Sequence, residues 1–336
     1  MSRRQRRLRL FLPAVLLLAG CGGSGDPATG IAPTSDSGPA ASSAGAAAVG
    51  GVVADAEVIK QLAYASASGR QVLHLSLPVR TGSRVPVVVL VHGGGFETGG
   101  KGDVRFLVEV LNAAGYATAA IDYRLSGEAL FPAAVQDVKA AIRLVRSIAP
   151  VHGIDPDQIA VWGLSAGGHL AAMAGVSGDQ RTVLDGESSS DSSASSSVQA
   201  VVAWYAPTDF AAMDRQAIDP GGCPGVPDLH DPADSPESRW LGGALDDVPE
   251  VVRSATPAQY LDAASVVPPF YLAHGDRDCT VPYGQTLEFA DALRSAGADV
   301  SVDIVTGAGH AERPFDQAQI EPSISFLDRV FHRPTG

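Results

Sequence analysis

Short apolar segments alternate with longer amphipathic segments along most of the chain, starting near residue 72. The short segments are rich in Val and Ile, and several are apolar throughout, which is typical of strands covered on both faces. This pattern predicts strands at residues 72–79, 85–92, 117–123, 159–164, 199–206, 269–275 and 300–307.

The longer segments predict helices. Within residues 132–149, apolar side chains recur at spacings of three and four residues from Val135 to Val145, which places them on one helical face. Pro132 stands near the first turn of this helix, a position that proline favours. The predicted helices are residues 104–115, 132–149, 166–175, 284–297 and 321–333.

Strands and helices that alternate at these lengths predict an α/β fold with a mostly parallel, doubly wound sheet. Right-handed crossovers place helices on both faces of such a sheet. The segment 207–268 interrupts the alternation with Pro, Asp and Gly and contains Trp240. We expect this segment to form a small cap-like insertion beside the functional site, within one folded domain at residues 52–334.

The first 51 residues differ in composition from the rest of the chain. Five arginines between Arg3 and Arg9 precede an apolar run at residues 10–20 that is too short to span a bilayer. Residues 1–20 are therefore typical of a secretory signal peptide. Residues 21–51 consist mostly of Gly, Ala, Ser, Pro and Thr, which predicts a flexible tether.

The predicted cleavage site, 18-LAGC-21, resembles the lipobox of bacterial lipoproteins. The resemblance implies that Cys21 becomes a lipidated N-terminus whose acyl chains insert into a membrane. We therefore expect an exported protein of the bacterial cell envelope, anchored to a membrane and facing away from the cytoplasm. An ordinary signal peptide with a chance cysteine at this position is the alternative.

Two further cysteines, Cys223 and Cys279, lie in the predicted folded domain. Exported proteins fold in oxidising compartments, where two remaining cysteines favour a disulfide. That bond would tie the segment 207–268 to the loop that carries Asp278. Two free, buried thiols are the alternative.

The net charge of the chain is −13, and removal of residues 1–20 changes it to −18. Nucleic acids require a basic face on their protein partners, so this balance argues against nucleic acid as a partner. The same charge disfavours anionic substrates by repulsion.

The stretch 163-GLSAG-167 follows a predicted strand and opens a predicted helix. This is the context of a nucleophile elbow, a sharp turn that exposes a serine hydroxyl at a helix N-terminus. Ser165 is therefore the candidate nucleophile. The backbone N–H of Ala166 lies at the same helix end, where it is free to stabilise a developing oxyanion.

A second glycine-rich stretch, 92-HGGGF-96, ends the most apolar predicted strand. Acyl transfer needs further backbone donors for the oxyanion, and glycines let the backbone approach a substrate closely. The N–H groups of Gly94 and Gly95 are the candidate donors, with His92 bracing the loop. A plain turn or a phosphate cradle is the alternative, although no Lys-Ser/Thr pair of a P-loop lies nearby.

A serine nucleophile needs a histidine base, and the histidine needs a carboxylate to fix its tautomer. The stretch 274-HGDRDCTVP-282 offers Asp276 and Asp278, and the glycine-rich stretch 307-GAGHAERP-314 offers His310. The order serine, acid, histidine along the chain is that of α/β-hydrolases. Each candidate follows a separate predicted strand, so the three side chains can converge at the carboxyl edge of the sheet.

These motifs resemble those of serine esterases of the α/β-hydrolase superfamily. The closest groups are the hormone-sensitive-lipase-like esterases and the bacterial feruloyl- and acetyl-xylan-esterase-like lipoproteins. The matching stretches are 92-HGGGF-96, 122-DYRLS-126, 131-FPAAVQDV-138, 163-GLSAGGHLA-171, 203-AWYAPTDF-210, 274-HGDRDCTVP-282 and 308-AGH-310.

The resemblance assigns a role to each candidate residue. It implies that Ser165 is the nucleophile, that His310 is the base, and that Asp278 rather than Asp276 is the acid. It implies structural roles for Arg124 and Asp137. The implied oxyanion donors are the backbone N–H groups of Gly94, Gly95 and Ala166.

We therefore expect a carboxylic ester hydrolase that acts through an acyl-enzyme intermediate, with no metal or organic cofactor. Many hormone-sensitive-lipase-like members continue 122-DYRLS-126 with Ala-Pro-Glu, whereas this chain continues as 127-GEALFPAA-134. This departure favours the feruloyl-esterase-like branch, and the expected substrates are short-chain, aryl or carbohydrate esters. The aromatic residues that either line the acyl pocket or pack in the core are Phe96, Trp204 and Tyr205.

Other functions are compatible with the same fold. A serine peptidase and an arylformamidase would use the same three side chains on an amide bond. A cell-surface binding protein that has lost its chemistry is an alternative from a different class.

Overall fold

The structure is a computed structural model that describes residues 57–79, 82–186, 194–219 and 223–332. The predicted signal peptide 1–20, Cys21 and the predicted tether 21–51 lie outside these residues. Within the described part of the chain, no helix combines the length and the apolar character that a bilayer crossing requires.

Eight strands of the described residues form one sheet in the order β1-β2-β4-β3-β5-β6-β7-β8. Strand β2 pairs antiparallel with β1 and β4, and every pair from β4 through β3 to β8 is parallel. The strands are β1 Glu57–Ala63, β2 Val72–Leu77, β3 Val85–Val91, β4 Ala117–Ile121, β5 Ile154–Leu164, β6 Ala200–Trp204, β7 Phe270–Gly275 and β8 Val300–Val305. The predicted α/β class and mostly parallel sheet are confirmed.

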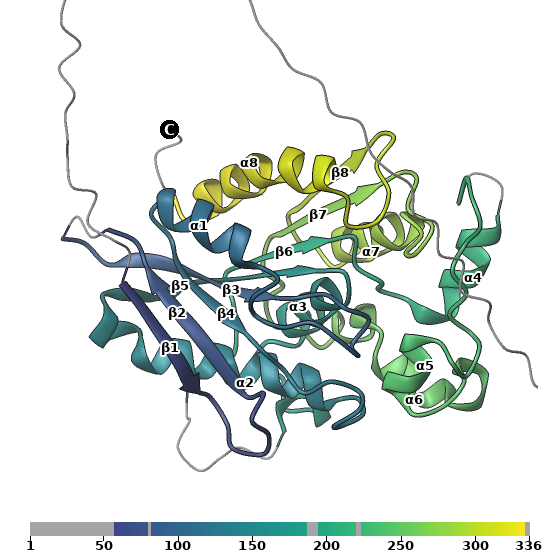
Figure 1. Ribbon diagram of the computed structural model, residues 1–336, viewed down its shortest axis with the longest axis horizontal. Coiled ribbons are helices and arrows are strands. Elements are labelled where there is room, and N and C mark those ends of the chain that lie inside the picture. The colour runs from purple at the N-terminus through teal and green to yellow at the C-terminus, as the bar shows by residue number, and fades with distance from the viewer. Residues whose placement is uncertain (1–56, 80–81, 187–193, 220–222, 333–336) are drawn as a thin grey trace, which may run out of the picture. The chain divides into compact units, whose positions relative to one another are not determined.

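Helices cover both faces of this sheet (Figure 1). On one face lie α1 Arg105–Ala113 and α8 Arg313–Val330, and on the other lie α2 Ala133–Ile148, α3 Ala166–Ser177 and α7 Gly284–Ser295. Strand β3 shows why both faces must be covered. Its successive side chains point to opposite faces, so Val89 packs in the core beneath α2 and α3 whereas Leu90 packs beneath α1.

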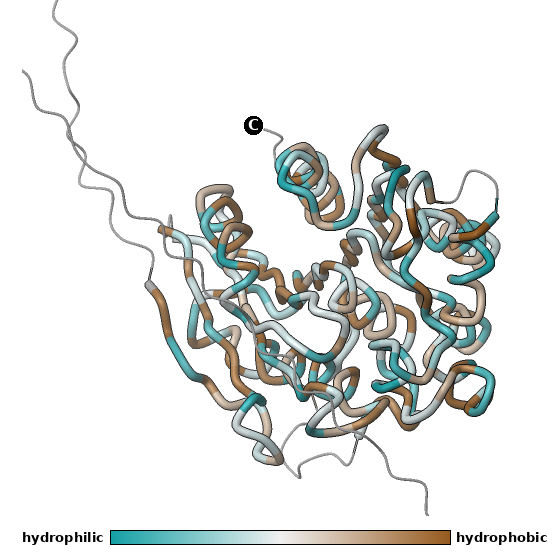
Figure 2. Tube along the Cα trace, turned by 45° about the vertical axis from the view of Figure 1, so that its right-hand side comes forward, coloured by the Kyte–Doolittle hydropathy of each residue, from teal (hydrophilic) through white to brown (hydrophobic). Residues whose placement is uncertain are grey.

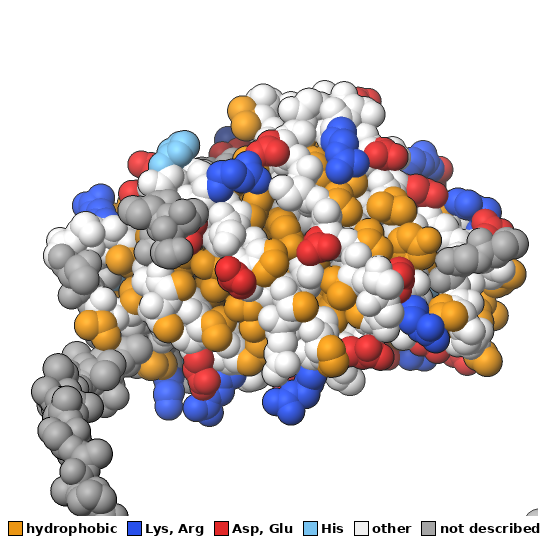
Figure 3. All heavy atoms as spheres, turned by 90° about the horizontal axis from the view of Figure 1, so that it is seen from above, with side chains coloured by type: hydrophobic (Ala, Val, Ile, Leu, Met, Phe, Trp, Pro, Cys, Tyr) orange, Lys and Arg blue, Asp and Glu red, His pale blue; other side chains and the backbone are white. Residues whose placement is uncertain are grey.

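The outer helices have one face toward the sheet and one toward solvent, and their hydropathy reflects this. Figure 2 shows hydrophobic and hydrophilic residues alternating along the outer helices. On the face seen in Figure 3, Lys and Arg side chains are interspersed with Asp and Glu among hydrophobic and uncharged groups. This face therefore carries no field of a single sign.

The described residues of the segment 207–268 form short helices and contribute no strand to the sheet. It forms the expected insertion between β6 and β7. Its helices are α4 Phe210–Ile218, α5 Pro236–Leu241, α6 Pro249–Ser254, η3 Leu245–Asp247 and η4 Pro257–Tyr260, while η1 Ala149–His152 and η2 Val183–Asp185 lie earlier in the chain.

The last helix begins earlier than predicted. The sequence pattern places its start at residue 321, where Pro322 would occupy the first turn, but α8 begins at Arg313 and contains Pro322 in its interior. Two features explain the difference. Pro314 provides another proline in the first turn, and Phe315 is fully buried against the rings of Trp204 and Tyr205.

Two strands also differ from the prediction. Strand β1 was not predicted as a strand, and β5 begins at Ile154, five residues before its predicted start. In the described sheet, strand β1 is an edge strand that pairs with β2. Its residues 58–63 are half-buried or exposed, so its hydropathy carries little periodic signal.

Arg124 and Asp137 tie the start of α2 to the loop after β4. The Arg124 guanidinium and backbone N–H donate to the Asp137 carboxylate at distances from 2.7 to 3.1 Å. Gln71 donates to the same carboxylate at 2.7 Å. These contacts are consistent with the structural roles expected for Arg124 and Asp137.

Replacement of Ile142 by Ala will destabilise the protein, because Ile142 is fully buried on the core face of α2. The expected loss is about 2–5 kcal/mol in the free energy of unfolding. The control is Val151→Ala, since Val151 in η1 is 79% exposed and its replacement should change that free energy by less than about 0.5 kcal/mol. Urea unfolding of both variants checks this, and equal shifts of the midpoint would contradict it.

Candidate active site

Ser165 stands alone between the last residue of β5 and the first residue of α3. Its backbone has φ 54° and ψ −123°, a strained conformation for a residue with a side chain. Two backbone hydrogen bonds hold it there. The Ser165 N–H donates to the Trp204 carbonyl at 2.9 Å, and the Ser165 carbonyl accepts the His169 N–H at 3.0 Å.

The glycines on either side of Ser165 leave no room for a side chain. A Cβ atom on Gly163 would lie 2.0 Å from the Gly167 carbonyl oxygen, and one on Gly167 would lie 2.3 Å from the carbonyl oxygens of Val91 and His92. Strand β5, helix α3 and the end of β3 can therefore meet only with glycine at both positions. Strand β3 lies between β4 and β5, so this meeting point is where the winding of the sheet reverses.

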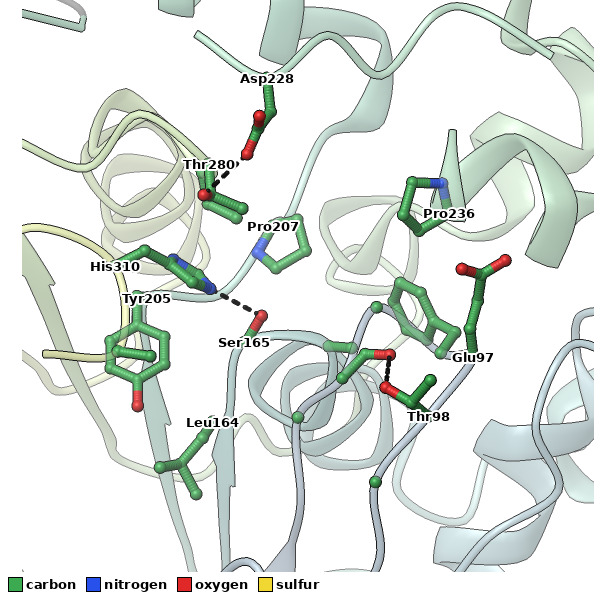
Figure 4. Close-up of a pocket in the computed structure, with 18 of the residues that line it drawn as sticks. Glu97, Thr98, Leu164, Ser165, Tyr205, Pro207, Asp228, Pro236, Thr280 and His310 are labelled. Atoms are coloured by element: carbon green, nitrogen blue, oxygen red, sulfur yellow. Dashed lines mark hydrogen bonds between the residues drawn. The ribbon is translucent and has the colours of Figure 1, made fainter. Parts of the chain in front are cut away.

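Two loops from other strands bring His310 and Asp278 to this serine, and Figure 4 shows the contact between His310 and Ser165. His310 lies between β8 and α8, and its Nε2 is 3.0 Å from the Ser165 Oγ. Asp278 follows β7, and its Oδ2 is 2.6 Å from the His310 Nδ1. The structure thus brings together the three side chains that the sequence analysis selected.

The Asp278 carboxylate is buried and has a donor at each oxygen. Its Oδ1 accepts the backbone N–H groups of Thr280 and Val281 at 2.9 and 2.8 Å. Its Oδ2 faces His310 and lies 3.2 Å from the His274 Nε2. Burial acts to raise the pKa of Asp278, but the hydrogen bonds and charges of the two histidines hold that pKa well below its usual range.

Asp276 has a different position. Its carboxylate accepts the backbone N–H of Gly307 at 2.6 Å, which braces the loop after β8. Asp278, not Asp276, is therefore the carboxylate that meets His310.

The stretch 92–96 forms the start of the loop after β3, and its residues 93–96 line the same cleft as Ser165. Among the described residues, the backbone N–H groups of Gly94, Gly95 and Ala166 have no acceptor within the protein. His92 is buried, donates from Nδ1 to the Gly93 carbonyl at 2.7 Å and stacks on the Tyr123 ring. It lies behind the loop, in the bracing position expected for it.

A cleft of about 890 Å³ opens above Ser165. The insertion supplies one wall, which includes Asp228 and Pro236, and Figure 4 shows the Asp228 carboxylate directed toward Thr280. Its apolar lining includes Val104, Phe106, Leu164, Tyr205, Pro207 and Val281.

The three aromatic candidates for this lining divide between cleft and core. Phe96 and Tyr205 line the cleft, although Phe96 also stacks on Trp240 with the ring centroids 4.0 Å apart. Trp204 is fully buried, packs on Trp162 and donates to the Ser323 hydroxyl, so it belongs to the core.

Sequence motifs did not reveal the support on the far side of His310. The Tyr205 ring packs edge-on against His310 with centroids 4.8 Å apart, and the Tyr205 hydroxyl donates to Asp316 at 3.2 Å. Burial raises the pKa of Asp316, opposed by the Tyr205 hydroxyl and by His310. Contacts of this kind join residues far apart in the sequence and have no fixed spacing.

The insertion is linked covalently to the loop that carries Asp278. Cys223 and Cys279 form a disulfide. The backbone N–H of Asp228 donates to the Cys279 carbonyl at 2.9 Å, and the Thr280 hydroxyl donates to the Asp228 carboxylate at the same distance.

Of the remaining histidines, His169 and His274 lie deepest. His169 is buried beside Trp240, with its Nδ1 2.8 Å from the Pro207 carbonyl, and burial lowers its pKa to about 4. His274 bonds to the Thr286 hydroxyl and the Val281 carbonyl. Within the described ranges, no group of three or more His, Cys, Asp or Glu side chains has the arrangement of a metal site.

Comparison with known proteins places this geometry among esterases. The BD-FAE family profile matches residues 73–293. The chain is 33% identical to Esterase LipC of Mycobacterium tuberculosis over 255 residues, which cover 74% of this chain and 59% of LipC. The chain thus spans about three fifths of that relative's length.

Two solved structures share the fold over most of their length. A truncated carbohydrate esterase from gut microbiota superposes with a TM-score of 0.72 and 29% identity, covering 82% of this chain and 96% of that one. The propionate-bound esterase Est2 of Thermogutta terrifontis gives a TM-score of 0.64 and 25% identity, covering 84% and 97% of the two chains.

Replacement of Gly163 by Ala will destabilise the turn at Ser165, because the added methyl group meets the backbone of Gly167. The expected loss is at least about 1–3 kcal/mol in the free energy of unfolding. Gly102→Ala is the matched control, since a Cβ there has no neighbour within 4 Å. Chemical denaturation compares the two variants, and a Gly163→Ala protein as stable as the control would show that the turn can relax.

Proposed function

Because this chain belongs to the BD-FAE family, we propose that it hydrolyses carboxylic esters through an acyl-enzyme on Ser165. One observation carries the proposal. His310 is hydrogen-bonded to the Ser165 hydroxyl through Nε2 and to the Asp278 carboxylate through Nδ1.

The reaction begins when the Ser165 Oγ attacks the ester carbonyl carbon and its proton passes to the His310 Nε2. Asp278 accepts the Nδ1–H of His310, which keeps Nε2 unprotonated before the attack and stabilises the imidazolium after it. The imidazolium then protonates the leaving alcohol as the carbon–oxygen bond breaks. Water, deprotonated by His310, attacks the acyl-enzyme, and the returned proton releases the acid and regenerates Ser165.

The tetrahedral intermediate carries its negative charge on the former carbonyl oxygen. The N–H groups of Gly94, Gly95 and Ala166 are the proposed donors to this oxygen. Their position in the cleft and their lack of a protein acceptor support the role, because such donors need no rearrangement when charge develops. Ala166 also lies at the N-terminus of α3, where the helix dipole favours negative charge.

We propose short-chain acyl groups on aryl or carbohydrate alcohols as the substrates. The similarity to a carbohydrate esterase supports carbohydrate alcohols, and the similarity to a propionate-bound esterase supports short acyl groups. The acidic groups in the cleft wall, including Glu97, Asp103 and Asp228, support neutral alcohols over anionic ones.

Replacement of Ser165 by Ala will remove nearly all ester hydrolysis, because the Ser165 hydroxyl is the group that contacts the His310 Nε2. The expected fall in kcat is about 10⁴- to 10⁶-fold. The measurement uses p-nitrophenyl esters from acetate to decanoate, methyl ferulate and acetylated xylan, with residues 51–336 and the same fragment carrying Ser165→Ala.

Each result of this experiment has a distinct meaning. Serine-dependent hydrolysis that is fastest for short acyl groups supports the proposal. Serine-dependent cleavage of anilide or formanilide analogues without ester cleavage would assign amide chemistry instead. No cleavage of any substrate, together with no labelling of Ser165 by a fluorophosphonate, would identify a non-catalytic protein.

We also propose that the protein is exported and lipidated at Cys21, which anchors it to a membrane of the bacterial cell envelope. The arginine-rich start, the apolar run at 10–20 and the motif 18-LAGC-21 support this. Two or more acyl chains on one residue are enough for stable anchoring.

Replacement of Cys21 by Ser will move the full-length protein, expressed in a bacterial host, from the detergent phase to the aqueous phase of Triton X-114. Mass spectrometry of the native N-terminus should find residue 21 acylated. The matched control is Ser24→Ala, which leaves the motif intact. Equal partitioning of native and Cys21→Ser proteins would contradict lipidation.

A further inference from the structure

A buried histidine–carboxylate pair that the proposed mechanism does not use lies in the wall of the cleft. His230 and Glu237 are 3% and 5% exposed. The His230 Nδ1 is 2.7 Å from the Glu237 Oε2, and the His230 Nε2 is 2.7 Å from the Thr280 carbonyl oxygen. His230 thus connects the insertion to the loop that carries Asp278.

Both ring nitrogens of His230 face oxygen acceptors. A carbonyl oxygen can only accept, so Nε2 must carry a hydrogen, and a neutral imidazole then has no second N–H for Glu237. A proton must therefore lie between Nδ1 and the Glu237 carboxylate if both contacts are hydrogen bonds. An imidazolium beside a carboxylate meets this condition and forms hydrogen bonds of the stronger, charge-assisted kind.

The groups around His230 favour the imidazolium. Burial lowers the pKa of His230, but Glu237, the Thr280 carbonyl and Asp214 together raise that pKa above its ordinary value. Asp214 lies on α4 and accepts the backbone N–H of His230 at 2.6 Å. Asp231, the next residue, interacts electrostatically with the same ring.

The peptide bond between Thr280 and Val281 joins this pair to Asp278. Its carbonyl accepts from His230, and its N–H, which belongs to Val281, donates to the Asp278 Oδ1 at 2.8 Å. Hydrogen bonds in such a chain polarise one another, so a charged donor at the carbonyl strengthens the bond that the N–H makes. This series of hydrogen bonds ends at His310, whose Nδ1 is bonded to the other oxygen of Asp278.

We propose that His230 is a positioning residue for the reaction: held as an imidazolium by Glu237, it fixes and polarises the Thr280–Val281 peptide and thereby holds Asp278 against His310. His230 acts through Asp278 and not on the reacting atoms. This inference rests on the proposed function, because it assigns Asp278 its role in the triad.

Protonation of His230 should make kcat depend on pH. A raised pKa means that the contacts of His230 are complete at low pH and are lost as the pH rises through that pKa. The kcat of the native enzyme should therefore decline as the pH rises through the pKa of His230.

Two substitutions separate the effect of the His230 hydrogen bonds from the effect of the charge on the His230–Glu237 pair. His230→Phe keeps an aromatic ring but leaves the Thr280 carbonyl without its donor. Glu237→Gln keeps both hydrogen bonds, because its amide N–H can donate to Nδ1 while Nε2–H donates to Thr280, but the pair then carries no charge. Glu250→Gln, a carboxylate-to-amide change at an exposed position of α6, is the matched control.

The test measures kcat and KM for p-nitrophenyl acetate against pH in the full-length protein, with melting temperatures to verify folding. His230→Phe should lower kcat by about 10- to 100-fold, since small misplacements of catalytic groups have effects of this size, with KM nearly unchanged. Glu237→Gln should lower kcat less and remove the alkaline decline. Glu250→Gln should match the native enzyme.

A spectroscopic measurement tests the proposal without ester turnover. In ¹⁵N-histidine-labelled native protein at about pH 7.5, a unit above the ordinary histidine pKa, His230 should have hydrogens on both ring nitrogens. In His230→Phe, the signal of the His310 Nδ1 proton should shift.

The outcomes distinguish failure of the positioning role of His230 from failure of the proposed esterase function. A folded His230→Phe enzyme with native kcat, or a His230 that is neutral at this pH, would overturn the positioning role. A native protein that hydrolyses no ester would overturn the proposed function, while the histidine spectra would still decide whether the charged pair exists and acts on His310.

Discussion

The left-handed backbone of Ser165 is the constraint on which the arrangement of the cleft depends. A residue with a side chain occupies this conformation only when its surroundings enforce it. Here the enforcement is steric, because the backbones of β5, α3 and the end of β3 approach so closely that Gly163 and Gly167 have no space for a methyl group. The same contact that strains Ser165 therefore sets the position of the glycine-rich loop after β3 beside it.

The charge of Asp278 is the second requirement of this arrangement. A buried carboxylate is unfavourable unless donors surround it, and two backbone N–H groups together with two histidines supply them. These donors come from the loop after β7, from β7 itself and from the loop after β8. The carboxylate thus joins the two C-terminal strands of the sheet as well as orienting His310.

Local signals in the sequence were sufficient for the centre of the fold and of the candidate site. The apolar runs of the inner strands and the glycines around Ser165 reflect constraints that act within a few residues, and the structure brings Ser165, Asp278 and His310 together as expected. Strand β1 and the first two turns of α8 were missed, because tertiary contacts stabilise them: pairing with β2 in one case and burial of Phe315 in the other. The link from His230 to Thr280 spans 50 residues without a motif, so only the folded structure reveals it.

The contact between His310 and Ser165 also constrains how the protein folds. It joins residues 145 positions apart, and three more strands and the insertion lie between them along the chain. Contacts of such long sequence separation form late, after the loop-closure entropy of the intervening chain has been overcome. During synthesis, the turn that presents Ser165 emerges well before its base and its acid, and the hydroxyl stays without its partner until β7 and β8 have joined the sheet. The completed Ser165–His310 hydrogen bond is therefore a marker that the part of the sheet from β5 to β8 has assembled.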